Sequence, residues 1–181
     1  GLDLRGTNAT GISVDAGSTG STFSFTETLI ANATDYGVDL AANDSTYTFA
    51  DTTISLNTAL GGVRGNATGA MNFSNLNVTM NTGTSFIAGT AAPQAGDITI
   101  NGTNSLVNSS TTAPAISARA SMVDMTFNTI TSGVANATGI AADFTGTGSG
   151  TFTVTDAFTV GGAAGSAANV NDDGAVTVSV P

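Results

Sequence analysis

Large apolar residues recur along this chain at an almost constant interval. Six short runs that alternate apolar and polar residues each contain one member of a set that we call the Phe ladder: Phe25, Phe49, Phe73, Ile100, Phe127 and Val154. The intervals within the ladder are 24, 24, 27, 27 and 27 residues. A period of about 20 to 50 residues is typical of repeat proteins, whose units bury their apolar side chains against one another. The ladder therefore predicts a stack of similar units.

Two further apolar columns accompany the Phe ladder. One precedes it in each unit and consists of Ile12, Val38, Val63, Ile87, Ile116 and Ile140. The other follows it and consists of Ile30, Ile54, Val78, Val107, Ile130 and Val160. β-branched and aromatic residues that alternate with polar ones indicate strands, and no window has sustained helical periodicity. Each unit is therefore expected to contain three short strands.

Three strands in each repeat of 24–27 residues predict an all-β fold, a three-sided parallel β-solenoid (β-helix) of about six to seven coils. Residues 1–181 form a single domain in this interpretation, with clear repeats over 6–160 and a degenerate terminal coil over 161–181. A β-sandwich is the alternative, because it also contains many short strands. The joint recurrence of three columns favours the solenoid, since a sandwich does not require it.

The charge of the chain is strongly one-sided. Thirteen acidic residues stand against three arginines, there is no Lys or His, and the net charge is −10. Nucleic acid and anionic membranes are disfavoured as partners, because both are bound mainly through Lys and Arg. No apolar stretch approaches the roughly 18 residues of a membrane span. The absence of Cys excludes disulfides and thiolate metal ligands, and we expect no cofactor.

A turn sequence recurs with the same period. The segment Asn-Ala-Thr-Gly-Ile at 8–12 is repeated unchanged at 136–140, and variants begin at Asn32 and Asn66. This small-residue turn, followed by a Thr-rich alternating strand, resembles the passenger regions of bacterial autotransporters and related right-handed parallel β-helix surface proteins. The resemblance covers about residues 6–160. It implies an extracellular, cell-surface location and a role in adhesion, in aggregation or as a structural rod.

The two ends of the chain are both able to form strands, and a solenoid leaves unpaired strand edges at its ends unless they are capped. The residues concerned are Leu2 and Leu4 near the start, and Val176, Val178 and Val180 near the end. Such edges can pair head to tail with other copies and build an open fibre. We therefore expect a non-catalytic extracellular structural or adhesive protein, whose partners are other copies of itself and cell-surface or carbohydrate ligands. The alternative, that both ends continue into further sequence, stays open.

Nine Asn-X-Ser/Thr sequons are candidates for N-glycosylation, which would agree with a secreted surface protein. They lie at Asn8, Asn32, Asn43, Asn66, Asn72, Asn77, Asn101, Asn108 and Asn136. Four of the nine are the tripeptide Asn-Ala-Thr. Duplication of the repeated turn is therefore the alternative explanation for their number.

Two patterns of oxygen ligands are candidate sites of chemistry. Asn169, Asn171 and Asp173, followed by Gly, loosely match the start of a calcium loop, but no Glu follows at the twelfth position, which favours a simple Asx-rich turn. Asp97 and Asp124 are predicted to stack about 4.8 Å apart in neighbouring coils, and a pair of carboxylates is what a glycoside hydrolase needs. No basic residue accompanies them, so a carbohydrate-active β-helix is the alternative hypothesis rather than the favoured one.

Ice binding is a third hypothesis. Flat arrays of outward-facing Thr on β-solenoids resemble the ice-binding faces of antifreeze proteins. The polar column next to the ladder is predicted to consist of Ser24, Thr48, Asn72, Thr99, Thr126 and Thr153. Asp97 and Asp124 interrupt the adjacent column, however, and the strand propensity of Thr explains the column equally well.

Overall fold

The computed structural model describes residues 1–6, 9–89, 95–133, 140–161, 166–169 and 175–181, which contain strands and turns but no helix. The strands of one sheet, the long sheet, are β1 (Leu2–Leu4), β3 (Thr22–Ala31), β5 (Thr46–Leu56), β7 (Met71–Met80), β9 (Ile98–Asn101), β10 (Ser105–Asn108), β12 (Val123–Ser132), β14 (Ser149–Val160) and β16 (Ala175–Ser179). The strands of the other, the short sheet, are β2 (Thr10–Val14), β4 (Tyr36–Leu40), β6 (Gly61–Gly65), β8 (Thr84–Ala88), β11 (Ile116–Ala118), β13 (Ile140–Asp143) and β15 (Ser166–Asn169).

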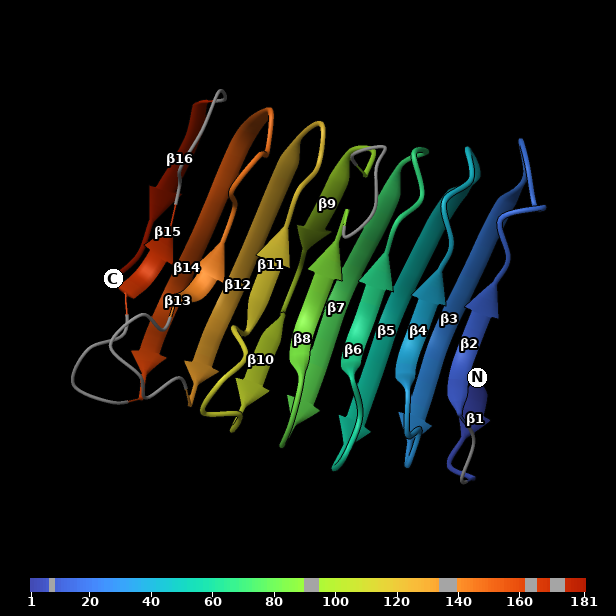
Figure 1. The fold of residues 1–181 in the computed structure, drawn as a ribbon, viewed down its shortest axis with the longest axis horizontal. Coiled ribbons are helices and arrows are strands. Elements are labelled where there is room, and N and C mark those ends of the chain that lie inside the picture. Colours follow the sequence, from blue (N-terminus) through green and yellow to red (C-terminus); the bar gives the residue numbers. More distant parts are fainter. Residues whose placement is uncertain (7–8, 90–94, 134–139, 162–165, 170–174) are drawn as a thin grey trace.

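The chain alternates between the two sheets and winds as a parallel β-solenoid of about six turns (Figure 1). Each strand pairs in parallel with its equivalent one coil away, as β3 does with β5 and β4 does with β6. The parallel pairing confirms the predicted solenoid and is not that of a sandwich, whose sheets are antiparallel.

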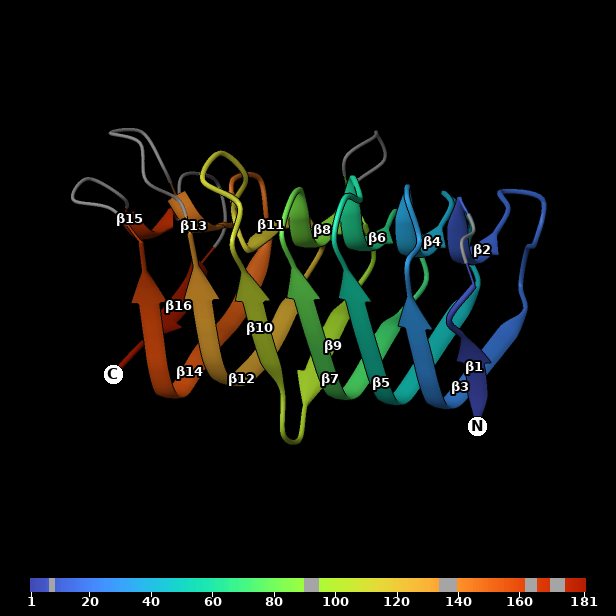
Figure 2. The same ribbon diagram turned by 90° about the horizontal axis from the view of Figure 1, so that it is seen from below.

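The long strands bend midway, so that the long sheet supplies two sides of the solenoid and the short sheet the third (Figure 2). In β3, β5 and β7 the bend falls at Glu27, Asp51 and Asn75, whose φ angles are 50°, 54° and 54°. Asn and Asp tolerate this left-handed backbone better than most residues. We call the side formed before the bend the leading face, which includes β9 and β16, and the side after it the trailing face, which includes β1 and β10.

The core contains a stack of aromatic rings from the Phe ladder. The ring centroids of Phe25 and Phe49 are 4.7 Å apart, and those of Phe49 and Phe73 are 5.2 Å apart, with nearly parallel planes. Phe86 of the short sheet meets Phe73 edge-on at 5.4 Å. Both stacked and edge-on arrangements are favourable for aromatic pairs. The first three positions of the ladder are therefore confirmed as one inward column.

The later part of the ladder differs from the prediction by two residues. Phe73 pairs with Ile100 as expected, but Ile100 pairs with Met125 and not with Phe127. Phe127 pairs with Val154, also as expected. Because residues two apart in a strand face the same side, alternation could not distinguish Met125 from Phe127.

Four members of the other two predicted columns were also wrong. The register places Phe86, Ala142, Leu106 and Phe158 where Ile87, Ile140, Val107 and Val160 were expected. Ile87 pairs with Arg64 on the outward side, and Val107 is 38% exposed. The connections between coils differ in length, and counting along the sequence does not show where the extra residues lie.

Glycine is required at a position where the short sheet passes close to the trailing face. A Cβ on Gly62 of β6 would lie 2.5 Å from the carbonyl oxygen of Ser85 and 2.7 Å from Cγ1 of Val78. Gly62→Ala is therefore expected to lower the free energy of unfolding by about 1–3 kcal/mol, as measured by urea denaturation. Gly17→Ala is the control, because an added Cβ there meets no atom within 4 Å. Equal effects of the two variants would show that this close packing is unimportant.

Candidate functional site

The N-terminal end of the solenoid presents a strand edge without a partner among the described residues. β1 pairs only with Thr28–Ile30 in the second half of β3. The first half, Thr22–Thr26, pairs with β5 on one side and with no described strand on the other. Phe23 and Phe25 of this half are only partly buried, although they stack on rings of the next coil at 5.3 and 4.7 Å. The edge therefore combines free backbone groups with an apolar surface.

The C-terminal end presents the opposite half of a strand. β16 pairs with Ser149–Thr153, the first half of β14. The second half, Ala157–Val160, pairs with β12, and no other described strand lies beside it. Val176 and Val178 are partly buried against the core, and Val180 is 41% exposed.

The structure places the predicted assembly residues at the two ends of the molecule (Figure 1). Leu2 and Leu4 lie on β1, where Leu2 is 38% exposed and Leu4 packs against the core. Val176 and Val178 lie on β16 at the other end. Whether these ends join copies of the chain stays a prediction.

The described sequons differ in their accessibility. Asn32 and Asn101 are exposed, while Asn66, Asn72 and Asn77 are partly buried. Asn43 and Asn108 are buried, and their amide nitrogens donate hydrogen bonds to the carbonyl oxygens of Asp15 and of Gly83 and Pro114. A glycan on either buried amide would have to displace these bonds. Asn8 and Asn136 lie outside the described residues.

The predicted carboxylate pair is not assembled. Asp124 pairs with Thr99 of β9 and accepts a hydrogen bond of 2.8 Å from the Thr151 hydroxyl. Asp97 precedes β9 and does not stack on Asp124, because the pairing of β9 with β12 differs by two residues from the predicted one. The expected pair was therefore wrong.

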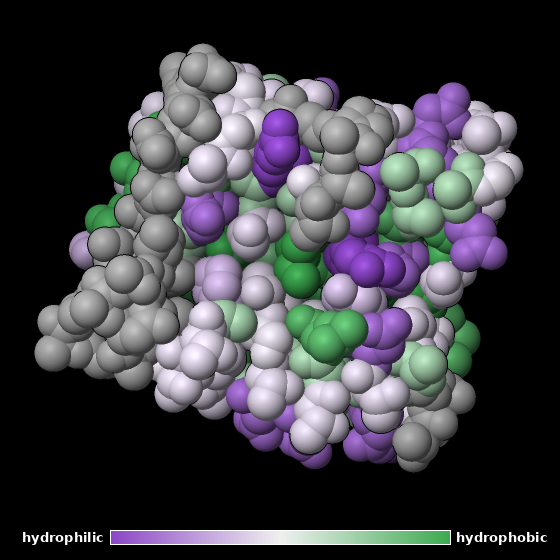
Figure 3. Space-filling model, viewed as in Figure 1, coloured by the Kyte–Doolittle hydropathy of each residue, from purple (hydrophilic) through white to green (hydrophobic). Residues whose placement is uncertain are grey.

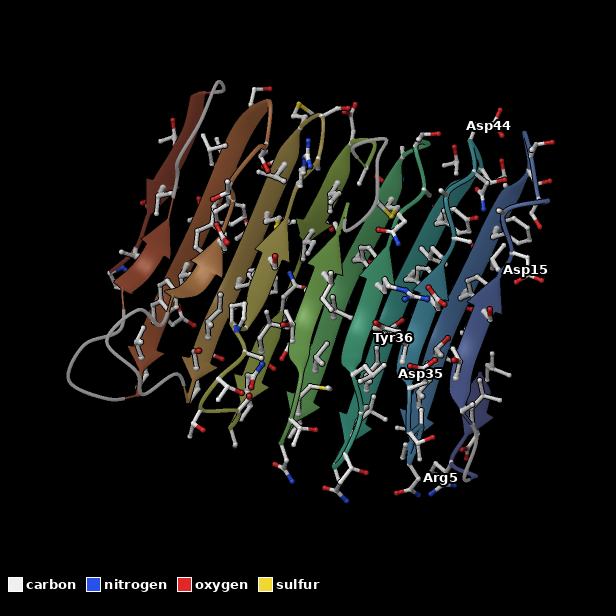
Figure 4. All side chains as sticks on the ribbon, viewed as in Figure 1. Arg5, Asp15, Asp35, Tyr36 and Asp44 are labelled. Atoms are coloured by element: carbon white, nitrogen blue, oxygen red, sulfur yellow. The ribbon has the colours of Figure 1, made fainter. Side chains whose placement is uncertain are left out.

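The calcium candidate cannot be placed on the described structure. Asn171 and Asp173 lie outside the described residues, and Asn169 ends β15. The described part of the chain contains no group of three or more His, Cys, Asp or Glu that could hold a metal ion. Carboxylates are dispersed over its N-terminal coils, where Asp15, Asp35 and Asp44 lie well apart from one another (Figure 4).

One charged cluster was not foreseen from the sequence. On the short sheet, Arg64 donates to both carboxylate oxygens of Asp39, at 2.7 and 2.5 Å, and its guanidinium lies 4.1 Å from the centre of the Tyr36 ring. The hydrogen bonds with Asp39 raise the pKa of Arg64 above its ordinary value, against an opposing effect of burial. The signal was present, because Asp39 and Arg64 directly follow the column members Val38 and Val63. The cluster ties two coils together.

A shallow depression of about 170 Å³ lies on the leading face beside the bend, lined by Thr48, Phe49, Asn72, Phe73, Ser74 and Asn101. Phe49 and Phe73 are themselves buried, so the accessible side chains of the depression are those of the Thr, Asn and Ser residues. None of the lining residues is charged. The depression could hold a small neutral polar group, but it contains no acid or base for catalysis.

The trailing face carries two outward columns without charge between β3 and β14. One contains Leu29, Thr53, Asn77, Ser105, Thr129 and Ala157, and the other contains Ala31, Ser55, Thr79, Val107, Thr131 and Thr159. The column that was predicted to be flat and polar lies on the leading face, and there Thr99 pairs with Asp124 instead of Thr126. The short-sheet side, by contrast, has hydrophilic and hydrophobic residues interspersed (Figure 3).

No protein-family model matches this chain, and no curated protein or solved structure is significantly similar to it. Among the described residues, no helix is long and apolar enough to cross a membrane. The strand order and pairing therefore define the class of the protein by themselves: it is a parallel β-solenoid repeat protein.

Proposed function

We propose that this solenoid is a non-catalytic extracellular rod, which acts as a surface adhesin or as a subunit of a fibre assembled end to end. The observation that carries the proposal is the state of the two ends, where half of a long strand has an unpaired edge and apolar residues are incompletely covered. Open edges of this kind favour pairing with another chain. The contact would be heterologous, since the two surfaces differ, and repeated contacts of this kind build a filament.

The extracellular location and the adhesive role rest on the sequence. Its repeated turn resembles autotransporter passengers, and its acidic surface has no Lys. The absence of catalysis is supported by the separation of Asp97 from Asp124, because that pair was the basis of the carbohydrate-active alternative. Carbohydrate binding without cleavage would use the uncharged depression beside Asn72 and Asn101.

Val178→Lys is expected to abolish end-to-end association of the purified 181-residue chain. Val178 faces the core at the C-terminal end, and a second copy that covers it would bury a charge there without a partner. The effect is measured as filament length by electron microscopy and as particle mass by sedimentation, both at high protein concentration. Thr177→Lys is the control, because Thr177 lies on the same strand and is exposed. A wild-type chain that stays monomeric at all concentrations would contradict the fibre role and leave the adhesive one.

Ice binding is a second candidate function, favoured by the uncharged trailing face. Its neighbouring strands lie about 4.8 Å apart and its two columns about 7 Å apart, which makes a regular array of hydroxyl and methyl groups. Thr131→Asp is expected to abolish thermal hysteresis, because a charge binds liquid water strongly in the middle of this face. Thr48→Asp on the leading face is the matched control, because Thr48 is exposed and its paired neighbours, Ser24 and Asn72, are uncharged. Absence of hysteresis in the wild-type protein would end this hypothesis.

A further inference from the structure

The described strands cross each of the three sides of the solenoid the same number of times. Seven segments lie on the leading face (β3, β5, β7, β9, β12, β14, β16), seven on the trailing face (β1, β3, β5, β7, β10, β12, β14) and seven in the short sheet (β2, β4, β6, β8, β11, β13, β15). Along the chain the order of sides is always trailing face, short sheet, leading face. The first described strand, β1, lies on the trailing face, and the last, β16, lies on the leading face. A second copy that follows β16 would therefore begin on the side that comes next in this order.

The two ends are also complementary in shape. At the C-terminal end, β16 stands out over the leading half of β14 and leaves the trailing half, Ala157–Val160, uncovered by any described strand. At the N-terminal end, β1 stands out over the trailing half of β3 and leaves the leading half, Thr22–Thr26, uncovered. Each end therefore projects a strand where the other end lacks one.

We infer that two copies of this chain join in one register, in which β16 of one copy pairs with Thr22–Thr26 of the next and β1 of that next copy pairs with Ala157–Val160 of the first. This inference rests on the proposed assembly function and specifies its contact. The pairing is parallel, like the strand pairings among the described residues.

The register follows from the side-chain columns. Coil by coil, the column of Phe23 leads to Val176, and the column of Phe25 leads to Phe152 and then to Val178. In the joint, Val176 therefore lies against Phe23 of the next copy, and Val178 lies against Phe25. The partly exposed rings at the N-terminal end would be covered by the apolar strand at the C-terminal end.

The side-chain columns also determine the register of the trailing half of the joint. Leu4 pairs with Ile30, whose column ends at Phe158, so Leu4 of the next copy lies against Phe158. Asp3 pairs with Leu29, whose column ends at Ala157, and its carboxylate already binds Arg5 of its own chain at 2.8 Å. Among the described residues that pair in this register, no carboxylate faces another, which limits repulsion between the strongly acidic copies along these strands.

Disulfide trapping tests the register, because the natural chain has no Cys. Ser24 and Thr177 are both exposed and belong to one outward column. In the joint their Cα atoms would be about 4.8 Å apart, which is within the range that a disulfide spans. Mild oxidation of the Ser24→Cys, Thr177→Cys double variant is expected to produce a ladder of covalent multimers on a denaturing gel. A link within one copy is excluded, because β3 and β16, which carry the two positions, lie at opposite ends of the solenoid (Figure 1).

Two control variants make the result decisive. Thr151→Cys with Thr177→Cys joins partners within one chain and should give an internal disulfide, which shows that the variants fold and oxidise. Thr26→Cys with Thr177→Cys is displaced by two residues and should give few multimers. Filaments that form without the Ser24–Thr177 link, or that link more strongly through Thr26, would overturn the register and leave the assembly function standing. Absence of both filaments and covalent multimers would contradict the proposed function as well.

Discussion

Asn104→Ala is expected to lower the free energy of unfolding by about 3–4 kcal/mol, because it leaves the buried N–H of Leu76 and the partly buried carbonyl oxygen of Thr126 without these partners. Asn104 is fully buried between β9 and β10, directly before β10 begins. Its Oδ1 accepts a hydrogen bond of 2.7 Å from the backbone N–H of Leu76, and its Nδ2 donates to the carbonyl oxygens of Thr126 at 2.8 Å and Gly102 at 3.2 Å. This amide therefore replaces strand pairing where β9 and β10 are interrupted.

Urea denaturation of Asn104→Ala measures this effect, and Asn81→Ala provides the control. Asn81 is exposed and donates to Oδ1 of Asn57 at 3.0 Å in the neighbouring coil. An exposed bond of this kind can be replaced by water, so we expect a change within about 0.5 kcal/mol. If both variants lost the same stability, the buried amide would not be what holds the segment between β9 and β10.

Phe73→Ala is expected to cost about 3–5 kcal/mol, the usual range when a buried Phe is truncated in a core that relaxes little. Its ring stacks on Phe49 and meets Phe86 edge-on, so the variant removes contacts with both sheets. The coils above and below are linked by continuous strand pairing, which limits how far they can close the cavity. The variant is expected to unfold at a clearly lower temperature at every protein concentration.

Phe25→Ala is the matched comparison at the end of the same column. Phe25 stacks on Phe49 at 4.7 Å but is only partly buried, so its truncation should cost less in dilute solution. At concentrations where filaments form, the cost should rise, because the joint would bury the ring. A concentration-independent loss as large as that of Phe73→Ala would contradict this account of the N-terminal end. Thermal unfolding monitored by circular dichroism over a range of concentrations separates the outcomes.

The sequence predicted the solenoid because aromatic and β-branched residues recur in every coil. Phe25, Phe49 and Phe73 were placed correctly since the first coils have equal lengths, so that counting along the chain gives the true register. The bend of the long strands was not predicted. The bend falls at the column Glu27, Asp51 and Asn75. These residues have a positive φ, which composition alone does not reveal.

The candidate site was harder to predict than the fold. Asp97 and Asp124 were expected to stack, but a shift of two residues leaves every inward side chain inward while it separates two outward ones. Hydrophobic periodicity therefore predicts which side of a strand a residue faces better than it predicts which residue of the next coil lies beside it. The link between Asp39 and Arg64 depends on such neighbours, and it was missed although Val38 and Val63 beside it were paired correctly. Which half of the long strand is left unpaired at each end could not be predicted, because it depends on where the long strands bend.

Strands that run across the axis of the solenoid determine how it would respond to a pulling force. Tension along the axis would load the hydrogen bonds of one coil boundary at a time, so that coils would peel from an end instead of failing together. Each released coil of roughly 25 residues would lengthen the molecule by about 85 Å, given about 3.4 Å per extended residue. A rod of this construction would yield in many small steps and dissipate work at each one, which would keep a surface attachment intact under fluctuating load.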